Sequence, residues 1–168
     1  MKKKLSILVI FLAAAAVIEF WFLALPQLSL QELGAVSDSP DLIERGEYLV
    51  VAGGCISCHR GQTEETSDTF AGGLPIETDF GTFYTPNITP DLTTGIGAWN
   101  ARDFLLALKH GRAPSGSFYY PTFPFRSYAG IEDQDVLDMA AYLMSLEAVY
   151  SDAVSYTHLR AHETREDR

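Results

Sequence analysis

The sequence predicts an all-α domain of three main helices joined by long loops, preceded by one amino-terminal membrane or signal helix. Apolar residues recur at helical spacing in three separate segments. Stretches rich in glycine and proline divide these segments. An apolar run also follows a basic start at the amino terminus. The 168 residues leave room for one ordinary domain plus extensions.

The amino terminus has the pattern of an export segment. Three lysines at positions 2–4 precede an apolar run over residues 5–25, which only Ser6 and Glu19 interrupt. About 21 apolar residues are enough to span a bilayer, and the lysines would stay on the cytoplasmic side. We therefore interpret residues 1–26 as a signal anchor or a signal peptide, favour the uncleaved anchor, and take residues 27–39 as a tether.

The exported part of the chain is strongly acidic. Residues 27–153 contain 18 acidic and 6 basic side chains, a net charge of −12. This charge excludes nucleic acid as a partner. It is equally consistent with a soluble acidic surface and with steering toward a basic partner protein.

The three helices have recognisable ends. The first follows Ser39 and Pro40, a capping hydroxyl and a first-turn proline, and stops at Gly53 before the cysteines. The second has Asn100 as its cap and Gly111 as its stop. The third runs from about residue 132 to 146.

Two long loops join these helices. Residues 61–97 show no sustained period, and we expect a short strand or two around positions 81–84. A loop of this length suits a domain in which a large buried cofactor replaces part of the core. Residues 112–130 form a second loop, rich in tyrosine, phenylalanine and proline.

The cofactor is indicated by the pentapeptide CISCH at positions 55–59, a C-x-x-C-H motif typical of covalent haem c attachment. Cys55 and Cys58 are the only cysteines, and each can bond to one arm of the porphyrin. His59 then provides the proximal iron ligand. A zinc site lacks further ligands, and no βαβ pattern supports a thioredoxin-like site. A thiol oxidoreductase without haem remains an alternative.

Further motifs extend the pattern. The chain contains, in order, RGEYL (45–49), CISCH (55–59), FAGGLPI (70–76), FGT (80–82), TPNITPD (85–91) and TGIGAW (94–99). On these motifs, residues 40–149 resemble a class I cytochrome c domain. They are similar to the membrane-associated multi-haem cytochrome c subunits of periplasmic alcohol, aldehyde and gluconate dehydrogenases. The resemblance to class I cytochrome c implies that the first and last helices cross closely, and we expect Gly46 of the first helix to lie against Tyr142 of the last.

The resemblance implies a role in electron transfer rather than catalysis. One covalently bound haem c would pass electrons between a dehydrogenase and a quinone-linked or oxidase complex. The protein would lie on the periplasmic side of the bacterial inner membrane, held by its amino-terminal helix, or in the periplasm if the signal is cleaved. Further haem domains would normally follow. We expect residues 150–168, whose composition changes abruptly, to be a non-native or disordered tail.

The sixth iron ligand is an open question. The family has methionine in a Y-P-x-M-P-Y loop, but here the stretch is YPTFPF (120–125), with Phe123 at the ligand position. His110 is a candidate distal ligand, and Tyr119, Tyr120 and Lys109 are others. An iron without a sixth protein ligand is also compatible with Phe123 at this position. The alternative function is therefore a haem protein that binds a diatomic gas or peroxide. Met139 and Met144 lie on the last helix, where ligation is disfavoured.

The remaining candidate residues would contact the haem. Apolar packing on the porphyrin is expected from Leu74, Pro75, Ile76, Phe123 and Phe125. Hydrogen bonds or ion pairs to the propionates are expected from Asn87, Trp99, Arg112 and Arg126.

Overall fold

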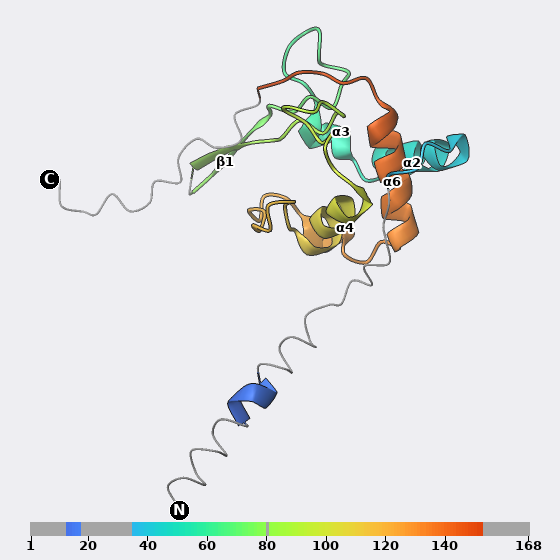
Figure 1. The fold of residues 1–168 in the computed structure, drawn as a ribbon. Helices are drawn as coiled ribbons and strands as arrows, with labels where there is room; N and C mark the ends of the chain where they lie inside the picture. Colours follow the sequence, from blue (N-terminus) through green and yellow to red (C-terminus); the bar gives the residue numbers. More distant parts are fainter. Residues whose placement is uncertain (1–12, 18–34, 80, 153–168) are drawn as a thin grey trace, which may run out of the picture. The chain divides into compact units, whose positions relative to one another are not determined.

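The computed structural model describes residues 13–17, 35–79 and 81–152 (Figure 1). The chain divides into two units, residues 1–33 and residues 34–168. In the first unit residues 13–17 are helical. Within the described ranges no helix is long and apolar enough to cross a bilayer. The predicted anchor (1–26) lies outside the described residues except for 13–17. The predicted tail (150–168) lies outside them except for 150–152, where the Ser151 N–H bonds to the Thr94 hydroxyl.

The second unit is built on two crossing helices. Helix α2 (Pro40–Ala52) and helix α6 (Asp133–Ser145) contact each other where they cross, as Figure 1 shows. A Cβ added at Gly46 would lie 1.9 Å from the Asp138 carbonyl oxygen and 2.9 Å from the Tyr142 Cβ. The predicted crossing of Gly46 with Tyr142 is confirmed, because only a residue without a side chain allows this approach.

Helix α4 (Ala101–His110) completes the helical core. Asn100 and Asp103 form a reciprocal capping box, and Gly111 ends the helix in the left-handed conformation, as predicted. Phe104 and Leu105 are fully buried, and so are Val136 and Met139 of α6. Ser39 is the residue before α2, but its hydroxyl makes no capping bond there, so that detail of the prediction is wrong.

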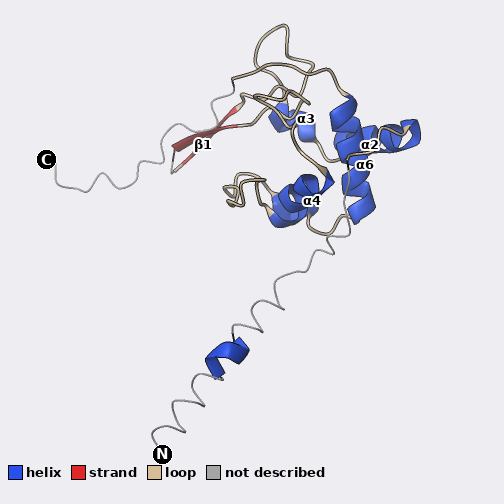
Figure 2. Cartoon of the chain, in the orientation of Figure 1, coloured by secondary structure: helices blue, strands red, loops and turns tan. Residues whose placement is uncertain are grey.

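The fold is mostly helical and also contains a small sheet, which corrects the all-α class but confirms the strand expected around residues 81–84. Strands β1 (Pro75–Thr78) and β2 (Gly81–Tyr84) pair antiparallel, with Ile76 opposite Phe83. Two short helices, α3 (Cys55–His59) and α5 (Phe125–Tyr128), were not predicted. Most of the chain between α3 and α4 is otherwise loop, as Figure 2 shows. Helices as short as α3 and α5 carry too little periodicity to be recognised.

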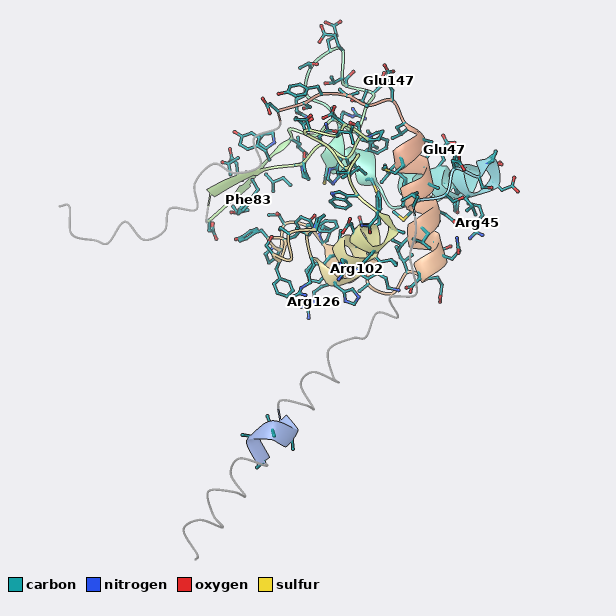
Figure 3. All side chains as sticks on the ribbon, in the orientation of Figure 1. Arg45, Glu47, Phe83, Arg102, Arg126 and Glu147 are labelled. Atoms are coloured by element: carbon teal, nitrogen blue, oxygen red, sulfur yellow. The ribbon has the colours of Figure 1, made fainter. Side chains whose placement is uncertain are left out.

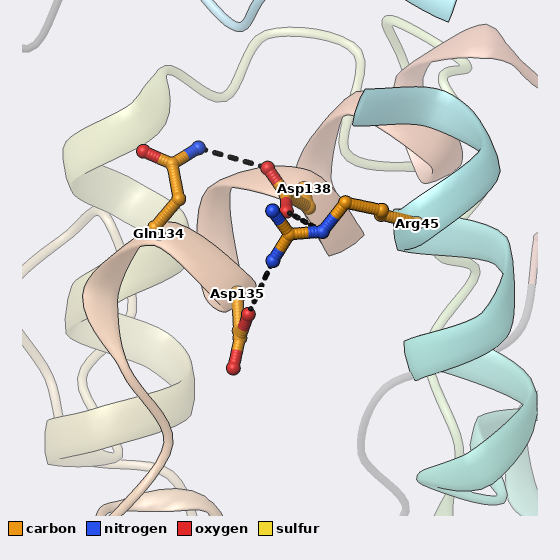
Figure 4. Close-up of polar contacts among 4 residues, drawn as sticks. All are labelled: Arg45, Gln134, Asp135 and Asp138. Carbon is orange, nitrogen blue, oxygen red and sulfur yellow. Dashed lines mark hydrogen bonds and ion pairs between the residues drawn. The ribbon is translucent and has the colours of Figure 1, made fainter. Parts of the chain in front are cut away.

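A polar cluster secures the crossing of α2 and α6 (Figure 4). Asp138 is fully buried, and its Oδ1 accepts a hydrogen bond of 2.8 Å from the Gln134 amide. Its Oδ2 lies 3.2 Å from Nε of Arg45. The Nη2 of the same guanidinium donates to Asp135 Oδ1 at 3.0 Å. That Oδ2 forms no hydrogen bond within the described residues, so its charge is balanced by the Arg45 guanidinium alone.

Candidate functional site

The two cysteines lie on α3, which starts directly after the turn at Gly53 and Gly54. Gly54 has φ +68°, and the N–H of Gly53 bonds to the Leu49 carbonyl at the end of α2. The thiols of Cys55 and Cys58 are not joined to each other. Burial raises the pKa of the Cys55 thiol, and Cys58 adds to this rise. A neutral thiol is a poor redox nucleophile, which argues against a thiol oxidoreductase.

One ring nitrogen of His59 is hydrogen-bonded, and the other has no partner among the described residues. Its Nδ1 lies 2.8 Å from the Pro86 carbonyl oxygen. Because a carbonyl can only accept, Nδ1 carries the proton and Nε2 keeps its lone pair. Burial lowers the pKa of His59, partly offset by the bond to Pro86, so the ring is neutral near pH 7. A neutral, oriented imidazole with a free Nε2 is what an axial iron ligand requires.

The Pro86 carbonyl is itself packed closely on one side. Gly72 has φ +72°, and a Cβ there would lie 2.5 Å from both the carbon and the oxygen of that carbonyl. The N–H of Gly72 donates to the His59 carbonyl at 2.8 Å. Gly72 thus contacts the backbone of both partners in the histidine hydrogen bond. The sequence pattern alone did not single out Gly72 or Pro86.

The β-hairpin contributes apolar side chains. Leu74 and Ile76 are half-buried, whereas Pro75 is exposed. Phe83 of β2 stacks on Tyr120 of the aromatic loop, with ring centroids 4.0 Å apart. This pair joins the hairpin to the loop that contains Phe123, and no periodicity in the sequence revealed it. Leu74 and Ile76 suit packing on a porphyrin, while the exposure of Pro75 does not support its predicted contact.

Phe123 is held in an aromatic cluster beside the cysteine segment. Its ring lies edge-on to Tyr119 at 5.6 Å and stacks on Tyr128 at 6.1 Å. The Tyr128 hydroxyl donates to the Gly53 carbonyl at 3.2 Å, two residues before Cys55. The loop around Phe123 therefore approaches the C-x-x-C-H segment, although a phenyl ring cannot coordinate iron. Phe125 is half-buried and packs on Gly111.

The other candidates for the sixth iron ligand differ in whether their side chains are already engaged. His110 is half-buried at the last position of α4. Lys109 is engaged elsewhere, since its Nζ donates to the Ile131 carbonyl at 2.8 Å and pairs with Asp133. Met139 is buried among the helices, and Met144 lines a shallow groove with Trp99. No described contact brings any of these side chains to His59.

The predicted propionate partners have other contacts. Both Nδ2 hydrogens of Asn87 are used, by the Val149 carbonyl at 2.7 Å and the Thr94 hydroxyl at 3.1 Å. Asn87 therefore has no free donor for a propionate. Trp99 packs edge-on to Phe104 and faces α6. Arg112 lies over the Phe118 ring at 4.7 Å, and Arg126 projects at the outer edge of the domain (Figure 3).

Taken together, the described side chains fit a covalently attached haem. Two unpaired thiols and a free imidazole nitrogen lie within one short helix. Half-buried apolar side chains from the hairpin and the aromatic loop accompany them. Among the described residues no cluster of three or more histidine, cysteine or carboxylate side chains offers an alternative metal site.

Comparisons with known proteins agree with this geometry. A diheme cytochrome c-type protein of Cereibacter sphaeroides is 49% identical over 104 residues, which are 61% of this chain and 35% of that protein. The gluconate 2-dehydrogenase cytochrome c subunit of Pantoea cypripedii is 44% identical over 122 residues, 73% of this chain and 27% of the subunit.

A third relative is the cytochrome c subunit of the quinone alcohol dehydrogenase of Gluconobacter oxydans, 41% identical over 103 residues. It is matched over 61% of this chain and 21% of its own length. The chain therefore spans about a third or less of the length of these relatives. The family profile named cytochrome c matches residues 43–147, more than half of the chain, and the chain belongs to the cytochrome c family.

Proposed function

We propose that this protein carries one haem c, bound through Cys55 and Cys58 with His59 as the proximal ligand, and that it transfers electrons. The observation that carries the proposal is the bond between His59 Nδ1 and the Pro86 carbonyl, which leaves Nε2 free. Membership of the cytochrome c family implies covalent haem c. The bound haem supplies a one-electron couple, whose potential depends on its axial ligands.

The residues of the chain have distinct roles in this proposal. The thiols keep the cofactor attached, and the Pro86 carbonyl fixes the tautomer and orientation of His59. Leu74, Ile76 and Phe125 provide apolar surface that lowers the local dielectric. Arg126 is exposed, so its guanidinium is accessible for an ion pair.

We further propose that the electron donor is a dehydrogenase and that the acceptor belongs to the respiratory chain. Relatives include cytochrome c subunits of gluconate, alcohol and fructose dehydrogenases, which supports this choice of donor. The basic and apolar amino terminus supports a position on the periplasmic side of the inner membrane. The acidic domain favours a partner with a basic docking surface.

The test is haem attachment in cells that contain the cytochrome c maturation machinery. We expect wild-type protein to give a pyridine haemochrome spectrum and to retain its pigment in acid acetone. The double variant Cys55→Ala, Cys58→Ala should lose covalent haem, while Ser57→Ala, within the same helix, should keep it. Colourless wild-type protein would refute the proposal.

A second candidate function rests on Phe123. The aromatic cluster holds the Phe123 ring at the position where the dehydrogenase cytochrome c subunits that the sequence resembles have their methionine ligand. The distal position of the haem can therefore be open to a diatomic gas or peroxide. Rapid CO binding by the ferrous protein would support this candidate. A low-spin ferrous spectrum unchanged by CO would support electron transfer alone and place another side chain, such as His110, on the iron.

A further inference from the structure

The segment after α6 is hydrogen-bonded to the loop that contains Pro86. Residues 149–151 run back over the loops, as Figure 1 shows at the red end of the domain. The Val149 carbonyl accepts from Asn87 Nδ2 at 2.7 Å, and the Val149 N–H donates to the Thr89 hydroxyl at 3.1 Å. The Ser151 N–H donates to the Thr94 hydroxyl at 3.1 Å. We call residues 149–151 the carboxy-terminal strap.

Asn87 joins this strap to the loop beneath it. Its Oδ1 accepts from the Thr89 N–H at 2.9 Å and from the Thr89 hydroxyl at 2.7 Å. Asn87 and Thr89 are both buried. With all four bonds satisfied inside the protein, the Asn87 backbone has little freedom to move, and its neighbour Pro86 shares that restriction.

The opposite side of Pro86 is equally restricted. Thr85 accepts from the Gly73 N–H through its carbonyl at 2.8 Å and from the Leu74 N–H through its hydroxyl at 3.0 Å. Gly72 packs against the Pro86 carbonyl, where a Cβ would lie at 2.5 Å. The carbonyl that holds His59 is therefore fixed by contacts from the FAGGLPI segment on one side and by the strap on the other.

We propose that Gly72 and Asn87 are positioning residues for the proximal ligand, and that the strap helps to set the reduction potential of the haem through the Pro86 carbonyl. The bond from Nδ1 makes the imidazole a more basic ligand, which stabilises ferric iron and lowers the potential. Displacing the carbonyl weakens that bond, so the potential rises. This inference rests on the proposed attachment of haem to Cys55 and Cys58.

The test compares matched variants of the haem-loaded full chain. Gly72→Ala is paired with Gly116→Ala, because Gly116 also has a positive φ, +87°, but no atom within 4 Å of an added Cβ. Asn87→Ala is paired with Asn100→Ala, which removes the cap of α4 and so destabilises the fold at a place away from the Pro86 loop. Thr89→Val serves as a second strap variant if Asn87→Ala does not fold.

Two measurements are informative: the midpoint potential by redox titration, and the iron–histidine stretching frequency of the ferrous protein by resonance Raman spectroscopy. Gly72→Ala should shift the equilibrium about tenfold toward the ferrous form, which is about 59 mV for one electron. Asn87→Ala or Thr89→Val should shift it in the same direction by less. In each case the stretching frequency should fall, while both controls keep wild-type values.

The outcomes separate the two proposals. A normal pyridine haemochrome with unchanged potential and stretching frequency in Gly72→Ala and Asn87→Ala would overturn the inference and leave haem attachment intact. A shift in Gly72→Ala alone would remove the strap from the proposal. Equal shifts in Asn87→Ala and Asn100→Ala would show general destabilisation and also overturn it. Wild-type protein without covalent haem would refute the proposed function itself.

Discussion

The helix crossing and the loops around the C-x-x-C-H segment are stabilised in different ways. At the crossing, Val50, Val136, Met139 and Leu143 are nearly inaccessible to solvent, so the helices bury each other. In the hairpin and the loops, Leu74, Ile76, Phe83 and Phe123 remain half-buried, and hydrogen bonds between side chains and backbone hold the chain. The helices complete their own core, whereas the loops present apolar surface that haem would cover.

Side chains of α2 and of the hairpin lie on different sides of the domain, as Figure 3 shows. Arg45 and Glu47 extend from α2 at the edge of the domain away from the hairpin that carries Phe83. The charged outer face of α2 and the aromatic face of β2 therefore lie on different sides. Substitutions at the crossing should change stability, and substitutions in the loops should change mainly the properties of the haem.

The largest effect is expected at the crossing itself. Gly46→Val would force a Cβ into the Asp138 carbonyl, 1.9 Å away, and should lower the free energy of unfolding by about 3 kcal/mol. Chemical denaturation of the haem-loaded protein measures this. Gly130→Ala, where an added Cβ meets nothing within 4 Å, should be nearly neutral. Equal stability of both variants would contradict the close packing described here.

A smaller loss is expected from the polar cluster. Arg45→Ala leaves the buried Asp138 carboxylate without its cation and should cost about 2 kcal/mol. Arg102→Ala provides the control, since Arg102 is exposed and has no ion pair within the described residues. The midpoints of unfolding in urea measure the difference in stability between the two variants. If Arg45→Ala matched Arg102→Ala, the pair would contribute nothing to the crossing.

In the loops, Phe123→Met should change the iron far more than the fold. The side chains are similar in volume, so the cost in stability should be about 1 kcal/mol. A thioether at this position could bind the iron, which should raise the potential and suppress CO binding. Absorption spectra with and without CO test this. Phe118→Met, at an exposed position, should leave both properties unchanged.

The smallest effect concerns Asp91 near the strap. Its pKa lies below the usual range because the Thr94 N–H, the Thr94 hydroxyl and the Thr93 N–H donate to it. The folded state therefore favours the charged carboxylate, and this stabilisation is present above the ordinary pKa and lost as the pH falls through the lowered one. Wild-type protein should lose stability below about pH 4 more steeply than Asp91→Asn. Parallel pH profiles of the unfolding midpoint would contradict this.

Local sequence signals predicted the positions of the three main helices and the attachment motif. Asn100 with Asp103 and Gly111 marked both ends of α4, because capping depends on neighbours within four residues. The third helix was expected at about 132–146 and is found at Asp133–Ser145. The C-x-x-C-H motif placed two thiols and an imidazole on one segment. The close approach at Gly46 was expected from the resemblance to class I cytochrome c, in which the first and last helices cross at a small residue.

Only the tertiary structure decided which side chains serve the site. Asn87 was expected to donate to a propionate, but it holds the strap, 62 residues away in sequence. The Pro86 carbonyl and Gly72 became visible as partners of His59 only once the loops were folded. Sequence reveals interactions between near neighbours through spacing, whereas contacts between loops depend on where the whole chain returns, and no periodicity encodes that.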